Sequence, residues 1–169
     1  LLFDPGEGWE YSISIDWVGK AVEAVTGMTL GRYMKANIFT PLGMKDSGFT
    51  VDQEQQSRRS AIHARTDSGK LEVLDRKFPE KPEFEAGGGG LSSTVGDYIK
   101  FTQMILHKGA FGGVRVLEPE TVELMSQNAM GDLNVRALKT AQPGRSRDVD
   151  FISDMKWGLS FLINPEPLP

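Results

Sequence analysis

The sequence begins LLFDPGEGWEYSIS, and one stretch within it, Phe3-Asp4-Pro5-Gly6-Glu7-Gly8-Trp9-Glu10-Tyr11-Ser12, decides how the rest is interpreted. Asp4-Pro5-Gly6 is a turn signal. Just beyond the stretch, apolar residues recur at the spacing of one helix face, at Ile15, Val18, Val22 and Val25. Gly27 then supplies a stop. The pattern predicts that Tyr11 lies at the junction between a turn and a helix.

Tyr11 has two interpretations when it is considered alone. A tyrosine acts as a general base only when its pKa falls from about 10 toward neutrality. A nearby ammonium group favours the phenolate and lowers a tyrosine pKa in this way. The sequence supplies none locally, because Lys20 is nine residues away, on the predicted helix. The local pattern therefore favours a packed aromatic side chain.

Further helices follow from capping residues and periodicity. Thr29 is a candidate cap for a helix that buries Leu30, Tyr33, Met34 and Ile38, and Pro41-Leu42-Gly43-Met44 ends it. Thr94 and Asp97 form a T-x-x-D capping box. We expect the helix behind it to bury one face, made of Tyr98, Phe101, Ile105 and Leu106, and to stop at Gly109. Glu118-Pro119 begins another helix, which carries Val122 and Met125 inward and ends near Asn128.

Extended segments are fewer. The runs 62–65 and 71–74 flank Asp67-Ser68-Gly69 and predict a hairpin. Residues 52–60 are polar and are expected at the surface, and 132–150 is expected to be a long loop, with strand pieces as an option. Trp157 to Ile163 is apolar and predicts a final strand. We therefore expect an α/β (α+β) architecture, with a helical lobe attached to part of a sheet.

Composition limits the possible functions. The chain has 169 residues, 39% hydrophobic and 25% charged, which is typical of one soluble globular domain. Its net charge is -4, so nothing draws it to nucleic acid, and it lacks a run of 18 apolar residues, so we predict no transmembrane segment. Without cysteine, the redox compartment cannot be inferred.

A run of four glycines, Gly87 to Gly90, precedes Leu91-Ser92-Ser93-Thr94. The run lacks the lysine of a phosphate-binding loop and does not match G-x-G-x-x-G in a strand–turn–helix context. Glycine here more readily permits positive φ or close backbone packing. We therefore interpret the run as a packing element.

Other chemistry-bearing patterns are weak. Ser153-Asp154-Met155-Lys156 has the S-x-x-K spacing, but it precedes an apparent strand, where residues three apart face opposite ways. Lys139-Thr140-Ala141 resembles K-T-G but lacks the glycine. His63 and His107 are far apart, and no carboxylate at metal-ligand spacing accompanies either. We therefore expect neither a metal site nor a cofactor.

The order of three blocks resembles the serine β-lactamase family. The blocks are F-x-P-G-x-x-W-x-Y-S at 3–12, P-L-G-M at 41–44 and G-G-G-G-L-x-S-T at 87–94, and they occur in that family in this order and at similar spacing. The resemblance covers about residues 3–128, and Trp157-Gly158-Leu159 fits the strand that follows. Closest in character are class C β-lactamases, penicillin-binding-protein-like esterases and peptidases acting on D-amino acids.

The resemblance implies a two-lobed β-lactamase/DD-peptidase-like fold with the active site between an α/β lobe and a helical lobe. Residues 1–169 would then be part of one such domain, with 1–130 mostly in the helical lobe and 131–169 a loop returning to the antiparallel sheet. The chain begins with Leu1 rather than Met and ends like a strand leaving an element, so we expect an internal portion of a longer protein.

The resemblance also implies the site residues. The family uses an S-x-x-K serine that is acylated, a Y-x-N or Y-x-S tyrosine that works with the lysine, and a K-T-G-like strand. The second motif falls on Tyr11, as the general base, with Ile13 at the asparagine position and Ser14 beside it as a weak substrate-binding candidate. We expect the first motif upstream of Leu1 and the third after Pro169.

These implications favour a serine hydrolase that acts on a small-molecule ester, amide, β-lactam or D-amino-acid peptide through an acyl-enzyme. Its partner would be the remainder of the same domain, and these residues alone would be inactive. Ile13 indicates the esterase-like branch. Two alternatives stay open: a non-catalytic sensor of penicillin or peptidoglycan, and an inert structural portion. The compartment, bacterial cytoplasm or periplasm, is not indicated.

Overall fold

Helix α1 (Ser14–Thr26) follows the predicted helical pattern closely. A computed structural model describes residues 2–74, 82–141, 143 and 146–166. Gly27 ends α1 with φ 67°, in the left-handed region, as predicted. Gly19 is the buried residue of this helix, whereas the side chains of Trp17 and Val25 are 72% and 87% exposed. The periodicity therefore placed the helix correctly, but its apolar stripe is open to solvent.

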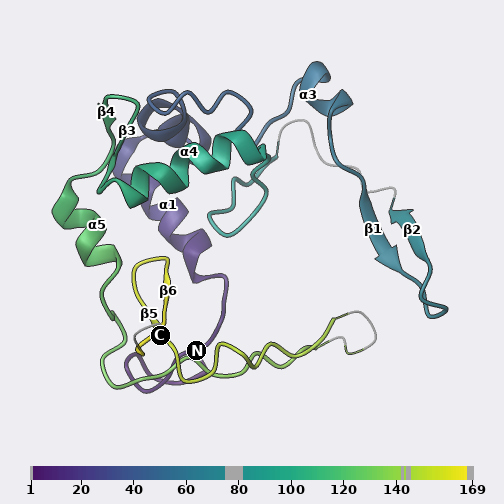
Figure 1. The fold of residues 1–169 in the computed structure, drawn as a ribbon, viewed down its shortest axis with the longest axis vertical. Coiled ribbons are helices and arrows are strands. Elements are labelled where there is room, and N and C mark those ends of the chain that lie inside the picture. Colours follow the sequence, from purple (N-terminus) through teal and green to yellow (C-terminus); the bar gives the residue numbers. More distant parts are fainter. Residues whose placement is uncertain (1, 75–81, 142, 144–145, 167–169) are drawn as a thin grey trace. The chain divides into compact units, whose positions relative to one another are not determined.

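The described residues form helices and short antiparallel strands, which confirms the α+β expectation (Figure 1). Each described strand pairs with one described neighbour, so these sheets have two strands each. After α1, the elements are α2 (Leu30–Met34), η1 (Lys35–Phe39), α3 (Gln53–Ser57), β1 (Ile62–Arg65), β2 (Leu71–Leu74), α4 (Val95–Leu106), β3 (Ala110–Phe111), β4 (Val114–Arg115), α5 (Pro119–Met125), β5 (Lys156–Trp157) and β6 (Leu162–Ile163).

The second predicted helix is divided into two kinds of turn. The Thr29 hydroxyl accepts a hydrogen bond from the Arg32 amide at 3.3 Å, so the predicted cap is confirmed. Leu30 is buried, whereas Tyr33, Met34 and Ile38 are half-buried. After Met34 the chain widens into the π-helical segment η1, which buries Phe39.

The predicted hairpin is confirmed. β1 and β2 pair antiparallel, with Ile62 opposite Leu74 and Arg65 opposite Leu71. Gly69 takes φ 82° in the connecting turn, a conformation that glycine adopts without strain.

The predicted buried face of α4 is partly wrong. Tyr98 and Leu106 are 60% and 79% exposed, whereas Met104 is fully buried and Asp97 is buried as well. The Thr94 hydroxyl accepts from the Asp97 amide, which forms the first half of the predicted cap. The Asp97 carboxylate instead accepts hydrogen bonds from the loop at Asp46 and Ser47. The helix therefore buries Asp97 and Met104 rather than the predicted face.

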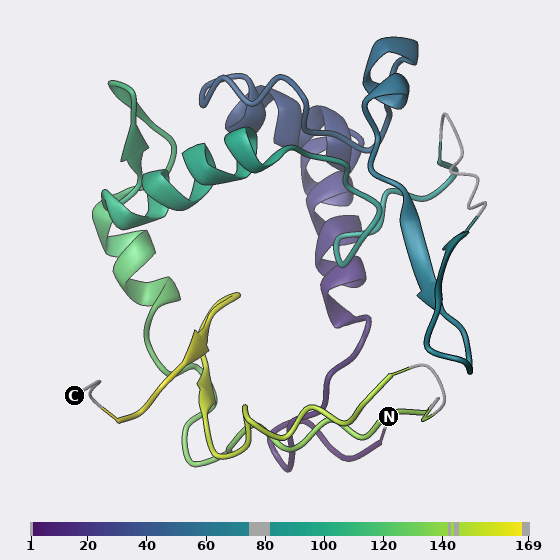
Figure 2. The ribbon, with the colours of Figure 1, turned by 45° about the vertical axis from the view of Figure 1, so that its right-hand side comes forward.

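One further prediction needs correction. The final strand is a hairpin of two short strands, β5 and β6, because the chain reverses between Gly158 and Phe161 and Ser160 takes φ 75° (Figure 2). The polar stretch 52–60 lies largely at the surface, as expected, and it also contains helix α3, with Asp52 and Gln55 forming a reciprocal capping box. The predicted helix at Pro119 is confirmed with Val122 buried, and it ends at Met125.

The chain forms two compact units. Unit 1 comprises Leu1–Ser12, Ile105–Ala110 and Leu117–Pro169, and unit 2 comprises Ile13–Met104 and Phe111–Val116. The buried apolar residues of unit 1 include Val122, Val135 and Ile152, and those of unit 2 include Leu30, Phe39, Leu42, Met44, Phe49 and Met104. The division into lobes at residue 130 stays a prediction.

Candidate active site

The segment that carries Tyr11 is anchored by its aromatic residues. The Glu7 amide donates to the Asp4 carbonyl at 3.1 Å across the predicted turn. A side chain at Gly8 would lie 3.1 Å from the Phe3 ring, so glycine allows Phe3 to pack against the backbone. Farther along, the Trp9 and Trp157 ring centroids are 5.9 Å apart. The block is therefore tied to the β5 strand of the same unit.

Tyr11 itself is reachable from solvent. Its side chain is 68% exposed, whereas Trp9, two residues earlier, is half-buried. A cavity of about 400 Å³ in unit 1 is lined by Trp9, residues 133–137, Ser153 and Asp154. Tyr11 does not line this cavity, and its side chain is exposed rather than sealed in the core.

Ser14 begins helix α1 and is exposed. Ile13, at the family's asparagine position, precedes it with φ -82° and ψ 16° and is 71% exposed. The apolar Ile13 side chain can offer van der Waals contact but no hydrogen bond. Ser14 therefore offers an exposed hydroxyl at this helix end, and its role as a substrate-binding residue stays a prediction.

The first turn of α1 packs directly against the glycine run. The Gly88 amide donates to Asp16 Oδ1 at 2.7 Å. A Cβ atom at Gly87 would lie 2.3 Å from the Ile15 carbonyl oxygen, closer than any side chain allows. The close-packing interpretation of the run is confirmed, and Asp16 occupies an amide that a phosphate would need.

Lys20 is committed to a neighbour in unit 2. Its amine donates to Glu23 Oε2 at 2.6 Å and lies 4.7 Å from the centre of the Phe84 ring. This lysine and the Leu30 amide lower the pKa of the Glu23 carboxyl. Lys20 is therefore already paired.

The S-x-x-K sequence at Ser153 does not form a nucleophile site. Residues 151–154 form turns, with Asp154 at φ 66°, rather than a helix. The Lys156 amine donates to the carbonyls of Gly131 and Leu133 at 2.9 and 2.7 Å. The amine is therefore used to hold a loop.

The K-T-A sequence is likewise structural. Lys139 pairs with Asp148 at 2.7 Å, and the Thr140 amide donates to the same carboxylate. Asp148 raises the pKa of Lys139, and Lys139 lowers the pKa of Asp148. These contacts pair the two sides of the loop around 140–148.

Two further features bear on the kind of site. Among the described residues, no three His, Cys, Asp or Glu side chains gather where they could hold a metal ion. Within the same residues, every helix is too short or too polar to cross a membrane.

The tyrosine block ahead of α1, the glycine run packed on that helix and the antiparallel hairpins define a β-lactamase/DD-peptidase-like fold. The Beta-lactamase family model matches residues 1–168, and the chain belongs to that family.

Relatives with named activities cover part of the chain. The monacolin J acid methylbutanoyltransferase of Aspergillus terreus is 34% identical over 131 residues, covering 75% of this chain and 31% of that protein. The lovastatin esterase of Penicillium rubens is 34% identical over 138 residues, covering 78% of this chain and 33% of that protein. The chain thus spans about a third of the length of these relatives.

Solved structures agree with this assignment. The unliganded simvastatin synthase of Aspergillus terreus superimposes with a TM-score of 0.75 and 30% identity, over 96% of this chain and 42% of that one. The fold expected from the three sequence blocks is therefore confirmed. The roles of Tyr11 and Ser14 stay predictions.

Proposed function

We propose that the protein containing this chain transfers an acyl group from a small-molecule ester or amide to water, through a serine-bound acyl intermediate, with Tyr11 as the general base. The observation that carries the proposal is the exposed phenol of Tyr11, within the tyrosine block of a Beta-lactamase family member. Relatives named as an esterase and as an acyltransferase support acyl transfer as the reaction class.

The proposed reaction has two balanced steps. In the first, the Tyr11 phenolate takes the proton of a serine hydroxyl, the serine oxygen attacks the substrate carbonyl, and the leaving alcohol or amine departs with that proton. In the second, water attacks the acyl carbonyl and gives a proton to Tyr11. The acid is released, and the serine oxygen recovers the proton. Serine needs such help because its hydroxyl is a weak nucleophile.

The serine and the supporting amine are assigned to parts of the domain outside residues 1–169. A phenol works as a base near neutral pH only when a cation stabilises the phenolate. Lys20 and Lys156 are both engaged, with Glu23 and with two carbonyls. As the family resemblance implies, a lysine from another segment of the domain would complete the pair.

The experiment uses the full-length protein and the ester p-nitrophenyl butyrate. Tyr11→Phe removes only the hydroxyl, and we expect kcat to fall by about 10²- to 10⁴-fold, the usual contribution of a general base. Tyr98→Phe is the matched control, because Tyr98 is also exposed and lies on α4. The role of Tyr11 would be wrong if both variants kept the parent rate and reacted equally fast with a fluorophosphonate.

Ile13 gives the substrate preference. An apolar side chain at this position offers no amide to the side chain of a β-lactam, whereas it can contact an aliphatic acyl group. We expect Ile13→Asn to raise the rate with a chromogenic cephalosporin relative to the rate with p-nitrophenyl butyrate. Ser14→Ala is expected to change the KM for the ester only slightly. An unchanged ratio would remove Ile13 from the specificity assignment.

The same position favours a second candidate, a binding protein that is acylated and does not turn over. Deacylation distinguishes the two functions, because the enzyme releases labelled acyl groups repeatedly while a sensor keeps one per molecule. Mass spectrometry of the intact protein during reaction with the ester measures this difference. Persistent stoichiometric acylation would favour the sensor.

A further inference from the structure

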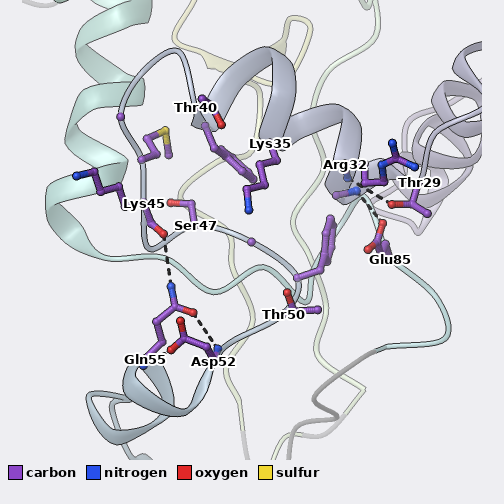
Figure 3. A pocket seen from close by; sticks show the side chains of 16 residues that line it. Thr29, Arg32, Lys35, Thr40, Lys45, Ser47, Thr50, Asp52, Gln55 and Glu85 are labelled. Carbon is purple, nitrogen blue, oxygen red and sulfur yellow. Dashed lines mark hydrogen bonds between the residues drawn. The ribbon is translucent and has the colours of Figure 1, made fainter.

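Unit 2 contains a hollow that the proposed acyl transfer does not use. Its volume is about 610 Å³, within the range of small-molecule sites. It is bounded by the α2–η1 segment, the loop 43–50, the start of α3 and Glu85 (Figure 3). None of these residues belongs to the Tyr11 block or to the rest of unit 1.

The hollow has an excess of positive charge. Arg32, Lys35 and Lys45 line it together with two carboxylates, Asp52 and Glu85, which leaves one positive charge uncompensated. Both carboxylates are already used, because Asp52 accepts the Gln55 amide at 2.8 Å and Glu85 accepts the Gly31 amide at 2.7 Å. Within the described residues, no ion pair joins any of the three cations to a carboxylate.

The geometry gives the hollow a polar side and an apolar side. In Figure 3 the Lys35 amine points into the space near Ser47, whereas the side chains of Lys45 and Arg32 extend outward on either side of it. Thr50 lies on the opposite wall, with its hydroxyl exposed. The apolar side consists of three buried residues, Phe39, Met44 and Phe49.

The backbone supplies an independent observation. Lys35 and Phe39 are the first and last residues of η1, and the Thr40 amide donates back to the Lys35 carbonyl at 2.9 Å. π-Helical turns are rare and occur frequently at functional sites. Here one such turn places a cation and an aromatic ring on the lining of one cavity.

We propose that this hollow binds an amphiphilic monocarboxylate. The carboxylate lies at the Lys35 amine. The hydrocarbon part covers Phe39, Met44 and Phe49. One excess positive charge suits a singly charged head better than a doubly charged phosphate ester, because the second negative charge would be desolvated without a partner.

The test measures binding of 4-phenylbutyrate to the full-length protein by calorimetry, beside uncharged 4-phenylbutyramide and phenyl phosphate. We expect the carboxylate to bind more tightly than both. Lys35→Gln is expected to weaken carboxylate binding by at least about tenfold, since it removes a charge-assisted contact. Lys35→Arg keeps the charge and is expected to restore most of the affinity.

Lys70→Gln is the matched control, because it makes the same charge change at an exposed position at the end of the β1–β2 turn. Carboxylate and amide affinities that are equal would overturn the proposal, and so would an affinity in Lys35→Gln equal to that in Lys70→Gln. Undetectable carboxylate binding at millimolar concentration would overturn it as well. None of these outcomes depends on whether Tyr11 is catalytic.

Discussion

Within each unit, polar contacts hold distant segments together, and the two units use contacts of opposite kinds. In unit 2, carboxylates reach across the chain to accept backbone amides: Asp16 from Gly88, Glu23 from Leu30, Glu85 from Gly31 and Asp97 from Asp46, at 2.7 to 3.0 Å. In unit 1, distant segments pair backbone to backbone, as between Val135 and Met155. There a cation, Lys156, holds two carbonyls.

The difference between the two units follows from the kind of segments that pack together in each of them. Helix ends and loops leave amides without partners, and carboxylate side chains satisfy them where no neighbouring strand can. Extended segments satisfy one another, as the paired stretches 133–138 and 149–155 do (Figure 2). Unit 2 therefore depends on negative side chains at particular positions, and unit 1 depends on chain pairing.

The largest expected effect is at Asp97. Its buried carboxylate also accepts from the Ser47 hydroxyl at 3.0 Å and from the Lys100 amine at 3.1 Å. Asp97→Ala leaves these donors unsatisfied, so we expect unfolding of unit 2 to become easier by about 3 kcal/mol. Hydrogen exchange of peptides from each unit measures this change. Asp132→Ala, at an exposed position of unit 1, is the control, and equal effects of the two variants would break the comparison.

A smaller effect is expected in the glycine run. Gly87→Ala places a Cβ atom against the Ile15 carbonyl, and the resulting backbone shift should cost about 2 kcal/mol. Gly89→Ala adds the same atom where nothing lies within 4 Å, so we expect a change within about 0.5 kcal/mol. Denaturant midpoints of the two variants give the contrast, and similar midpoints would show that the run is not closely packed.

In unit 1 the corresponding test is Lys156→Gln. Shortening the side chain frees the Gly131 and Leu133 carbonyls, and we expect a loss of about 1 kcal/mol, confined to unit 1 peptides in hydrogen exchange. Lys139→Gln removes a lysine from an exposed pair and should leave the midpoint unchanged. A larger effect at Lys139 would contradict the assigned role of Lys156.

The smallest expected effect is the response to acid. Lys20 and the Leu30 amide lower the pKa of Glu23, and Arg58 and Gln55 lower that of Asp46, from ordinary values of 4.5 and 3.8. In the unfolded chain these carboxyls bind protons at a higher pH than in the folded protein. The stability that they give to the folded state is therefore complete above these ordinary values and is lost as the pH falls through the lowered folded values.

Hydrogen exchange in unit 2 at pH 6 and pH 3, corrected for the intrinsic rates, measures the acid response, because pH 3 lies below both ordinary values. The double variant Glu23→Gln and Asp46→Asn should reduce the difference between the two pH values. If unit 2 of the parent protein were equally protected from exchange at both pH values, Glu23 and Asp46 would not contribute to its acid sensitivity.

Local signals predicted the elements that local chemistry determines. The spacing from Ile15 to Val25 with Gly27, the Thr29 cap and the two runs around Gly69 each placed an element correctly. Helix α3 was missed although Asp52 and Gln55 carried a capping-box signal within the polar stretch. That signal would have been enough to find it.

Features made by distant residues could not be predicted in this way. Asp97 is buried by contacts with Asp46 and Ser47, which lie about fifty positions away in sequence. The periodicity of α4 carries no signal of such contacts. The hollow beside Lys35 likewise combines residues from 29 to 85. The candidate role of Tyr11 rests on the family resemblance and stays a prediction, because the local pattern alone favoured a packed ring.

Unit 1 has a consequence for synthesis on the ribosome. Nearly all of unit 2 leaves the exit tunnel as one continuous stretch and can fold as it emerges. The tyrosine segment emerges earlier, but Trp9 can contact its aromatic partner only after Trp157 has been synthesised. Closing so long a loop is entropically costly, so the segment carrying the candidate base is among the last to be fixed in place.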